Sequence, residues 1–402
     1  MGKVPLPLHG KSDIAVRGQG KVAAVSIRSI VLIRERTHAM SEVTVTSLRA
    51  RPVLVPLHRP VVVMTGQVTS APLVLIDLEC SDGSVGRTYL FTYTPLALNA
   101  TTTLLRDLVP VIEGSSANPR DLRARLFERF KLLGAEGVTL MAIAGIDMAA
   151  WDALARRMDH PLYDVLGGVS KALPTYNSNG MGLVGPTKVA DEAKALLSHG
   201  GFSGLKVRLG YPDLATDLAV LSEVRGAVGE AITLMTDYNQ GLSVAEAKQR
   251  IAALAAHNLG WIEEPVAFDD YTGLAELRAI SQVPIQGGEN HWGQGDMARA
   301  IQARALDLVM IDVMKIGGIT GWIEASSLAR AAGWPVSSHI FPEVSTHLLC
   351  ADSGAHWLEW VDWANPILND PYEVIDGTVT PPDRPGMGLD WNEGNVARYL
   401  AT

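Results

Sequence analysis

Cysteine is scarce in this sequence. Only two occur among 402 residues, Cys80 and Cys350, and both lie in apolar surroundings. This count excludes a framework of disulfide bonds, which small secreted domains use to compensate for a small core. A reducing compartment is the natural one for such a chain, and we expect a cytoplasmic protein.

Long hydrophobic runs are also missing. The nearest candidate for a membrane span covers residues 22–33, and Arg28 interrupts it. It falls short of the roughly 18 uninterrupted apolar residues that a span needs. No segment has the pattern of a good signal peptide. We therefore expect no membrane partner.

Positive charge is in deficit, because the formal net charge is −9. General nucleic-acid binders gather Lys and Arg to neutralise phosphates, so this balance argues against a nucleic-acid partner. What the chain has in abundance is apolar residues, at 47%, against 19% charged residues. These fractions allow a large core and argue against wholesale disorder.

Residues 1–40 differ in composition from the rest. They hold seven Lys or Arg and only two acids, Asp13 and Glu35. Met40 is followed at once by a segment that alternates like a first strand. We expect residues 1–40 to be a disordered extension outside the domains, with Met40 as the original start. A targeting peptide is the alternative.

Residues 41–170 predict an α+β domain. Its local patterns follow one another as strands within 42–80 with an irregular stretch at 58–72, a hairpin turn at 81–86, and helices at 103–113, 120–133 and 137–158. The remaining length is about right for a barrel that accompanies such a smaller domain.

Within residues 171–360, short apolar runs and helical patterns alternate. Six of the runs close on an ionisable residue, at intervals of 26, 26, 23, 27 and 20 residues: Asp237, Glu263, Glu289, Asp312, His339 and Glu359. A fixed period of this kind indicates repeated βα units. Eight strands in about 190 residues predict an α/β fold, a modified TIM barrel of the (β/α)7β type with a reduced last helix. Residues 361–402 are irregular, and we expect them to pack back on the first domain.

Three acids at successive strand ends indicate a metal site. The carboxyl ends of barrel strands share one face, so Asp237, Glu263 and Glu289 would repel one another without a cation. Hard oxygen donors without Cys or clustered His favour Mg²⁺, or else Mn²⁺, over zinc. Taken singly, each acid could be a helix N-cap or a salt-bridge partner. Asn239 shares a strand face with Asp237 and could bind substrate or hold a ligand, whereas Glu264 should face away in a structural role.

Two cationic residues share one face of the second barrel strand. Lys206 and Arg208 are two residues apart, so their side chains point the same way. A solvated strand end is the alternative to a catalytic role. Nearby cations would lower the pKa of Lys206 and make it a usable base. The guanidinium of Arg208 stays protonated and suits gripping a carboxylate or enolate oxygen. Lys315 either reaches the ligand shell or forms a salt bridge.

The sixth, seventh and eighth strands end on a second group of ionisable residues. Asp312 lies one unit before His339, and a carboxylate behind an imidazole fixes its tautomer and raises its basicity. A lone histidine would more often be a core or surface residue. Glu359 could donate to a substrate carboxylate as a protonated acid, which requires a raised pKa. A structural glutamate is the alternative there.

Together these residues fit one reaction. A divalent metal, a base on each face of the substrate and an acid near one end would remove the proton alpha to a carboxylate. The metal and the hydrogen-bond donors would neutralise the charge that grows in an enediolate. A metal-dependent binding scaffold is the non-enzymatic alternative, and it would bind Mg²⁺ without any exchange of an alpha proton.

From about Ser41 to the C-terminus the chain resembles the enolase superfamily, and within it the mandelate racemase/muconate lactonizing enzyme family, mandelate racemase in particular. The strings that carry the resemblance are GIDMAAWDAL, KVR with GYP after it, DYNQ, WIEEP, GEN, DVMKIGG with TGW, SSH and AHWLE. The resemblance implies a homo-oligomer that acts on a small-molecule carboxylate, with a capping domain whose residues 56–71 form a flap over the substrate.

The same resemblance implies a role for each site residue. Asp237, Glu263 and Glu289 would be the metal ligands, and His339 with Asp312 the base for one enantiomer. Glu359 would be the electrophilic acid, Lys206 the first lysine of a Lys-x-Lys pair, and Ser178 and Asn239 substrate contacts. The resemblance also implies a Lys or His base that works together with Mg²⁺, as in that superfamily.

Arg208 departs from the family pattern, which has the second lysine there. It could be an unusually poised base, Lys206 could take over, or His339 could act alone, as suits an acid-sugar dehydratase. The apolar residues 60–64 of the flap favour an aryl or otherwise apolar 2-hydroxy acid over a polyol acid. Racemisation of a mandelate-like acid is therefore the prediction, and acid-sugar dehydration is the alternative.

Overall fold

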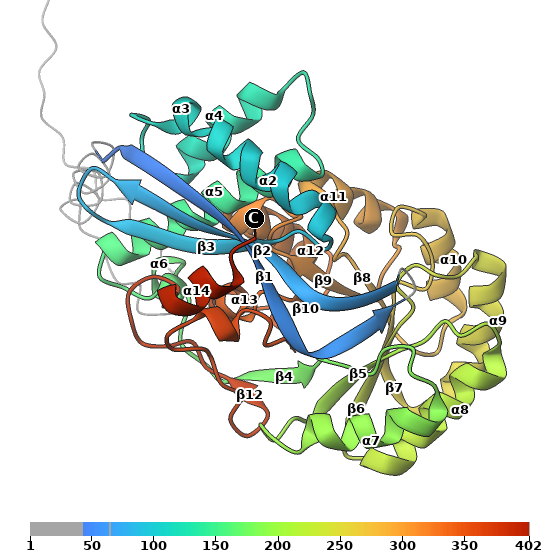
Figure 1. The fold of residues 1–402 in the computed structure, drawn as a ribbon. Coiled ribbons are helices and arrows are strands. Elements are labelled where there is room, and N and C mark those ends of the chain that lie inside the picture. The colour runs from blue at the N-terminus through green and yellow to red at the C-terminus, as the bar shows by residue number, and fades with distance from the viewer. Residues whose placement is uncertain (1–42, 64–65, 402) are drawn as a thin grey trace, which may run out of the picture. The chain divides into compact units, whose positions relative to one another are not determined.

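The first strands of the chain form an antiparallel sheet in the order β1, β2, β3 (Figure 1). The structure, a computed structural model, describes residues 43–63 and 66–401. The extension predicted for residues 1–40 lies outside the described residues, and so does Met64 of the predicted flap.

A long hairpin dominates this sheet, whose strands are β1 (Val45–Val63), β2 (Gly66–Cys80) and β3 (Val85–Phe91). β1 and β2 pair from Val45 opposite Cys80 to Val63 opposite Gly66, with a register shift between Pro56 and Val61. The irregular stretch predicted at residues 58–72 is therefore wrong, since most of it is paired strand. Pairing across the hairpin supplies partners for the backbone, and the shift accommodates the prolines.

The tight turn predicted at residues 81–86 joins β2 to β3. Gly83 has a φ of 84°, a left-handed conformation that favours glycine. The Asp82 carboxylate accepts a hydrogen bond from the Ser84 N–H at 3.0 Å. These local interactions explain why the turn could be predicted from the sequence.

Five helices follow the sheet: α2 (Pro95–Asp107), α3 (Val109–Ile112), α4 (Pro119–Phe130), α5 (Val138–Arg157) and α6 (Leu162–Val165). The prediction of a helix over residues 103–113 placed the start too late. The Thr94 side chain accepts a hydrogen bond from the Leu96 N–H and caps α2, and Pro95 begins it. A threonine before a proline is a helix-start signal that the sequence carries.

α5 is the core helix of this region and packs on β3. A side chain at Gly86 of β3 would collide with the backbone of Ala149 in α5, so small residues permit this close approach. By length and composition, α5 is the one described helix that could cross a membrane. However, 89% of that apolar stretch is buried inside the protein, which identifies it as a core helix.

Eight parallel strands form the barrel: β4 (Leu173–Asn177), β5 (Gly204–Arg208), β6 (Thr233–Asp237), β7 (Leu259–Glu263), β8 (Ile285–Gly287), β9 (Leu308–Asp312), β10 (Val336–His339) and β11 (Leu358–Trp360). They pair in chain order from β4 to β10, and β11 pairs with β4. The Val336 N–H donates to the Gly354 oxygen at 2.9 Å and the Ser338 N–H to the Trp357 oxygen at 3.0 Å, which closes the ring between β10 and β11.

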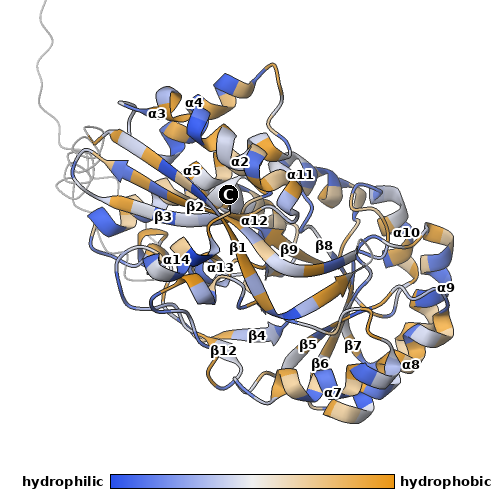
Figure 2. Cartoon of the chain, viewed as in Figure 1, coloured by the Kyte–Doolittle hydropathy of each residue, from blue (hydrophilic) through white to orange (hydrophobic). Residues whose placement is uncertain are grey.

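The helices that follow the barrel strands are α7 (Pro186–Leu197), α8 (Leu214–Val228), α9 (Val244–Leu254), α10 (Tyr271–Ile280), α11 (Gly293–Ala303), α12 (Gly318–Ala331) and α13 (Pro342–Ala351). A short 3-10 turn, η1 (Ala255–His257), extends α9. Directly after β11, a second 3-10 turn, η2 (Asn365–Ile367), stands in the place of an eighth barrel helix. The predicted (β/α)7β barrel is confirmed. Figure 2 shows hydrophobic strands inside and helices with one hydrophobic and one hydrophilic face around them.

The C-terminal segment contains β12 (Thr378–Val379) and α14 (Glu393–Tyr399). It contacts the first sheet, because the Ala401 N–H donates to the Pro52 oxygen at 2.9 Å and the Trp391 indole N–H to Asp77 at 2.8 Å. Near its middle, the Met387 N–H donates to Asp152 of α5 at 2.6 Å.

Candidate active site

A cavity of about 530 Å³ lies at the carboxyl ends of the barrel strands, and its volume suits a small ligand. Its apolar lining includes Val61, Val68, Phe91, Val138, Met141, Trp292, Ile340 and Trp363. Its polar lining includes Lys206, Arg208, Asp237, Asn239, Gln240, Glu264, Glu289, Asn290, Lys315 and His339. The cavity is therefore apolar where the β1–β2 hairpin meets it and ionisable at the barrel.

Strand register brings the predicted site residues side by side. Arg208 lies opposite Asp237, and Asp237 lies opposite Glu263, on three adjacent strands. On the other side of the barrel, Asp312 lies opposite His339. The regular spacing along the sequence thus places these residues at one end of the barrel.

Lys206 lies at the floor of the site and is 1% exposed. Its Nζ is 2.7 Å from Glu263 Oε1, 2.7 Å from Glu359 Oε1 and 3.6 Å from Asp237 Oδ2. Burial lowers the pKa of Lys206, but the carboxylates of Glu263 and Glu359 outweigh it and raise this pKa well above its ordinary value. Anions surround Lys206 here and set the direction of this shift, and the lower pKa predicted for Lys206 beside a bound Mg²⁺ stays a prediction.

Glu359 is ionised in this arrangement. Burial raises the pKa of its carboxyl, but the Lys206 ammonium and then His339 lower it to about 2. Its second oxygen accepts the Ile340 N–H at 2.8 Å. The predicted raised pKa of Glu359 is therefore wrong here, since each carboxylate oxygen has a hydrogen-bond donor that stabilises the charged form.

The three predicted metal ligands are buried and close enough to influence one another. Burial raises the pKa of Asp237 and Glu263, and the charge of Glu289 raises both further, while Lys206 opposes the shift. Asn239 holds Asp237 through its backbone N–H, at 2.7 Å, and its side-chain amide, at 2.8 Å. The Trp261 indole N–H holds Glu263 at 3.0 Å.

These carboxylates carry more negative charge than Lys206 neutralises. Among residues 43–63 and 66–401, no three His, Cys, Asp or Glu side chains converge closely enough to hold an ion as they stand. The donor set nevertheless fits a small hard cation in atom type and charge. Binding would require Asp237, Glu263 and Glu289 to close around the ion, with Glu263 shared between the ion and Lys206.

Glu264 faces the cavity, and the prediction that it points away is wrong. Its φ of 36° is left-handed, so the chain turns immediately after β7 and the alternation of a strand no longer applies. Both of its oxygens accept hydrogen bonds from the Asn290 amide, at 3.0 and 2.8 Å. Burial and then Glu289 raise the pKa of Glu264 to about 8.

His339 and Asp312 form a hydrogen-bonded pair. His339 Nδ1 lies 2.8 Å from Asp312 Oδ2, while Nε2 faces the cavity side and lies 3.3 Å from Glu289 Oε2. Burial lowers the pKa of His339, but Glu289 and the hydrogen bond to Asp312 outweigh it and raise the pKa to about 9. Any positive charge placed on Glu289 would weaken that effect.

Arg208 is tied to the barrel and not free. Its Nη1 donates to the Gly180 oxygen at 2.8 Å, and Nη2 lies 3.5 Å from the Ser178 hydroxyl. The buried Nε has no hydrogen-bond partner among the described residues. Ser178 is 1% exposed and is not among the residues that line the cavity, so it contacts Arg208 rather than open space.

The structure adds Tyr93 to the site, which the sequence analysis did not find. It lies just beyond β3, and its hydroxyl donates to Asp312 Oδ2 at 3.1 Å. Lys315, which also hydrogen-bonds Asn290, lies 4.0 Å from the centre of the Tyr93 ring. No local pattern marks Tyr93, because its role depends on contacts with residues more than 200 positions away.

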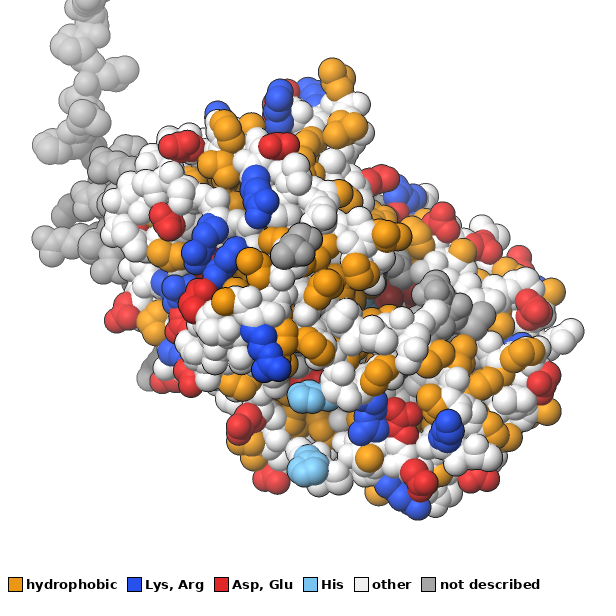
Figure 3. Space-filling view, viewed as in Figure 1, with side chains coloured by type: hydrophobic (Ala, Val, Ile, Leu, Met, Phe, Trp, Pro, Cys, Tyr) orange, Lys and Arg blue, Asp and Glu red, His pale blue; other side chains and the backbone are white. Residues whose placement is uncertain are grey.

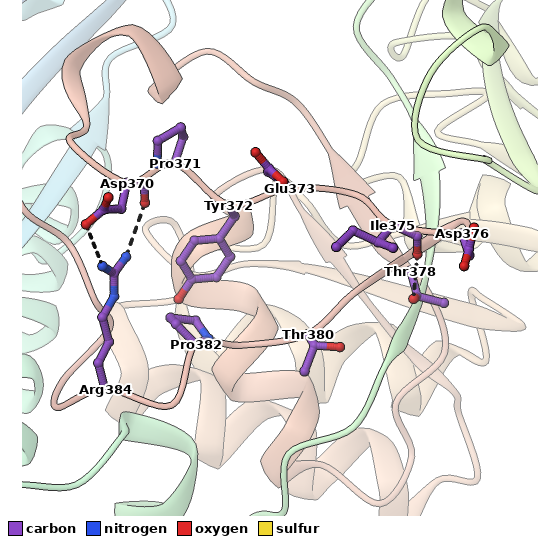
Figure 4. Close-up of a pocket in the computed structure, with 10 residues that line it drawn as sticks. All are labelled: Asp370, Pro371, Tyr372, Glu373, Ile375, Asp376, Thr378, Thr380, Pro382 and Arg384. Atoms are coloured by element: carbon purple, nitrogen blue, oxygen red, sulfur yellow. Dashed lines mark hydrogen bonds and ion pairs between the residues drawn. The ribbon is translucent and has the colours of Figure 1, made fainter.

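A second cavity, of about 460 Å³, lies within the C-terminal segment (Figure 4). Arg384 points into it but is paired with Asp370, and the Tyr372 hydroxyl donates to the Met387 oxygen. It contains none of the predicted site residues, and we assign it no chemistry.

Comparison with known protein families agrees with this geometry. Residues 45–167 match the mandelate racemase/muconate lactonizing enzyme N-terminal domain, and residues 188–395 match the enolase C-terminal domain-like family. The chain belongs to the mandelate racemase/muconate lactonizing enzyme family of the enolase superfamily. It is therefore an enzyme of a superfamily in which several solved relatives contain magnesium.

One solved structure similar to this chain is that of an enolase from Bradyrhizobium complexed with magnesium and mandelic acid. It is 43% identical, with a TM-score of 0.86 over 90% of this chain and 99% of that one. The 3,6-anhydro-alpha-L-galactonate cycloisomerase of Streptomyces coelicolor is 32% identical over 81% of this chain and 90% of that protein. The L-talarate/galactarate dehydratase of Salmonella typhimurium is 30% identical over 84% and 86%.

Proposed function

We propose that this enzyme removes the proton alpha to a carboxylate in a Mg²⁺-dependent reaction, and that it racemises an aryl or otherwise apolar 2-hydroxy acid of the mandelate type. The observation that carries the proposal is the His339–Asp312 pair, which faces a cavity with an apolar wall and a buried ammonium on its floor.

We assign the metal to Asp237, Glu263 and Glu289, with Mn²⁺ as a second ion that the same oxygen donors accept. The bound ion would supply positive charge for the carboxylate and enediolate oxygens of the substrate. Asn239 orients Asp237 through two hydrogen bonds and lines the cavity, so it is placed to contact substrate as well.

The proton chemistry falls to the chain's own residues. His339 Nε2 takes or returns the alpha proton on one face, and Asp312 fixes the tautomer that leaves Nε2 free. The Lys206 ammonium provides hydrogen bonds for the substrate carboxylate, and Glu359, ionised in this structure, positions that ammonium. Arg208 serves the opposite face, where its guanidinium can bind the enediolate oxygen. Proton return on that face requires Arg208 to be unusually poised or Lys206 to take over.

The apolar wall argues for the substrate class. Val61 and Val68 from the hairpin, with Phe91 from β3, contribute apolar side chains to the lining of the cavity. Hydroxyl groups of a polyol acid would lack partners there, whereas an aryl group would bury apolar surface. The mandelic acid bound by the Bradyrhizobium relative supports the same choice.

Acid-sugar dehydration is the second candidate, and Arg208 favours it. A guanidinium tied to the Gly180 oxygen at 2.8 Å is a poor base, so only His339 is suited to remove a proton. Elimination of water needs proton removal on one face only, and the Salmonella relative is a dehydratase.

A screen of 2-hydroxy acids and acid sugars in D₂O with Mg²⁺, followed by proton NMR, tests the proposal. We expect mandelate or a close analogue to exchange its alpha proton and to invert. Exchange without inversion would contradict racemisation, and formation of a 2-keto product from a sugar acid would establish the dehydratase. No exchange of any acid in the screen would overturn the proposal as a whole.

Two controls assign the chemistry. EDTA should abolish exchange, and added Mg²⁺ should restore it. His339→Asn, which cannot act as a base, should slow exchange by about 10²–10⁴-fold for the enantiomer on its face. Undiminished exchange of both enantiomers would remove His339 from the mechanism.

A further inference from the structure

Tyr93 reaches the His339–Asp312 pair from the capping domain. The residue follows β3 and has a φ of 60°, a left-handed conformation that is unfavourable for a tyrosine. The flanking chain is held, because the Thr92 hydroxyl donates to the Pro72 oxygen at 3.2 Å and Thr94 caps α2. These contacts keep Tyr93 in place despite the strain.

The hydroxyl of Tyr93 completes the shell of donors around Asp312. It donates to Oδ2 at 3.1 Å, the same oxygen that His339 Nδ1 contacts at 2.8 Å. The other oxygen accepts the N–H groups of Met314 and Lys315, at 2.8 and 2.9 Å. Without Tyr93, this buried carboxylate would be held by His339 and one loop only.

The ring of Tyr93 also constrains its neighbours. It lies nearly parallel to the His339 imidazole, at 10° between planes and 6.5 Å between centres. The Lys315 ammonium lies 4.0 Å from the ring centre on a cation–π contact. Tyr93 lines the cavity, and 36% of its surface is exposed.

We infer that Tyr93 is a positioning residue of the His339–Asp312 pair: its hydroxyl fixes the shared Asp312 oxygen and its ring limits the tilt of the imidazole. This inference rests on the proposed role of His339 in proton transfer. The acid/base unit is then built from two domains, because His339 and Asp312 come from the barrel and Tyr93 comes from the capping domain.

The test is Tyr93→Phe, which keeps the ring and removes the donor. Loss of one hydrogen bond to a charged group should lower kcat for alpha-proton exchange by about tenfold. KM should stay within about twofold, because the apolar wall is unchanged. A raised KM with unchanged kcat would show that Tyr93 is only part of the substrate wall and would overturn the inference.

A second readout needs no substrate. The proton shared by His339 Nδ1 and Asp312 should give a downfield NMR signal that His339→Asn removes, and Tyr93→Phe should shift or broaden it. An unchanged signal with unchanged kcat would overturn the inference. If no acid exchanges at all, the proposed function fails while this signal still tests the position of Tyr93.

Tyr372→Phe is the matched control. Tyr372 is a buried tyrosine whose hydroxyl also contacts a histidine, His347 Nε2, at 2.9 Å, but it lies in the C-terminal segment (Figure 4). It should leave kcat and the downfield signal unchanged. Should Tyr93→Phe fail to fold, Tyr93→Met replaces it. Met lacks both the ring and the donor, so it should lower kcat more, and an unaltered signal in that variant would equally overturn the inference.

Discussion

The buried acid Asp77 of the first sheet and the buried acids of the active site are compensated in opposite ways. In the first sheet, Asp77 accepts hydrogen bonds from Arg49, Arg51 and the Trp391 indole, and lies 3.4 Å from Arg87. The same arginines also pair with acids of the C-terminal segment. Every charge in this cluster has a partner of opposite sign.

The active site lacks this balance. Its buried acids outnumber its buried lysines and arginines by six to three: Asp237, Glu263, Glu264, Glu289, Asp312 and Glu359 against Lys206, Arg208 and Lys315. On the surface, by contrast, charges of both signs are interspersed over the face in Figure 3. The balanced cluster around Asp77 joins the first sheet to the C-terminal segment. In the active site, the excess of negative charge favours the binding of a cation.

Removing one acid from the unbalanced cluster should have the largest effect on function. We expect Glu289→Gln to slow alpha-proton exchange by at least about 10³-fold, because the ion loses a ligand. Mg²⁺ should no longer raise the melting temperature. The free energy of unfolding without metal should change by less than about 1 kcal/mol, since the substitution relieves repulsion. Full exchange activity in Glu289→Gln would break the comparison.

Removing the acid from the balanced cluster should act on stability instead. Asp77→Ala leaves three arginines and an indole N–H without their shared acceptor. We expect it to lower the free energy of unfolding by about 3 kcal/mol, measured by denaturant titration, with kcat per folded molecule unchanged. Asp390→Ala is the control, because its carboxylate is 46% exposed and should contribute less than about 1 kcal/mol. Equal losses in both variants would contradict this account.

Arg208→Lys should have the smallest effect and sharpens the comparison within the site. A lysine can release and accept a proton on the face opposite His339, so racemisation of mandelate should rise by about tenfold. Polarimetry measures it. Arg250→Lys is the matched control, since Arg250 is equally buried but pairs with Asp217 outside the cavity. No change in the racemisation rate of Arg208→Lys, or a loss, would show that the poor basicity of Arg208 does not limit racemisation.

Much of the fold could be predicted because its signals are local. Six of the barrel strands are short runs with an ionisable residue at or close to the carboxyl end, and parallel strands place those ends together. The long hairpin could not be predicted in the same way. Its residues 58–72 contain turn-forming types, and only pairing between β1 and β2 makes them strand. The late start predicted for α2 was a missed local signal at Thr94.

The candidate site also combines features that the sequence predicted and features that depend on tertiary contacts. Sequence spacing alone determined that Asp237, Glu263 and Glu289 lie together, and that Asp312 lies beside His339, because strand register follows from the repeat. Only the tertiary structure decided the direction of Glu264 and the contact of Tyr93. It also decided that Lys206 and Glu359 are a charged pair. Protonation and side-chain direction depend on burial and on neighbours that are distant in the chain, and no local pattern contains them.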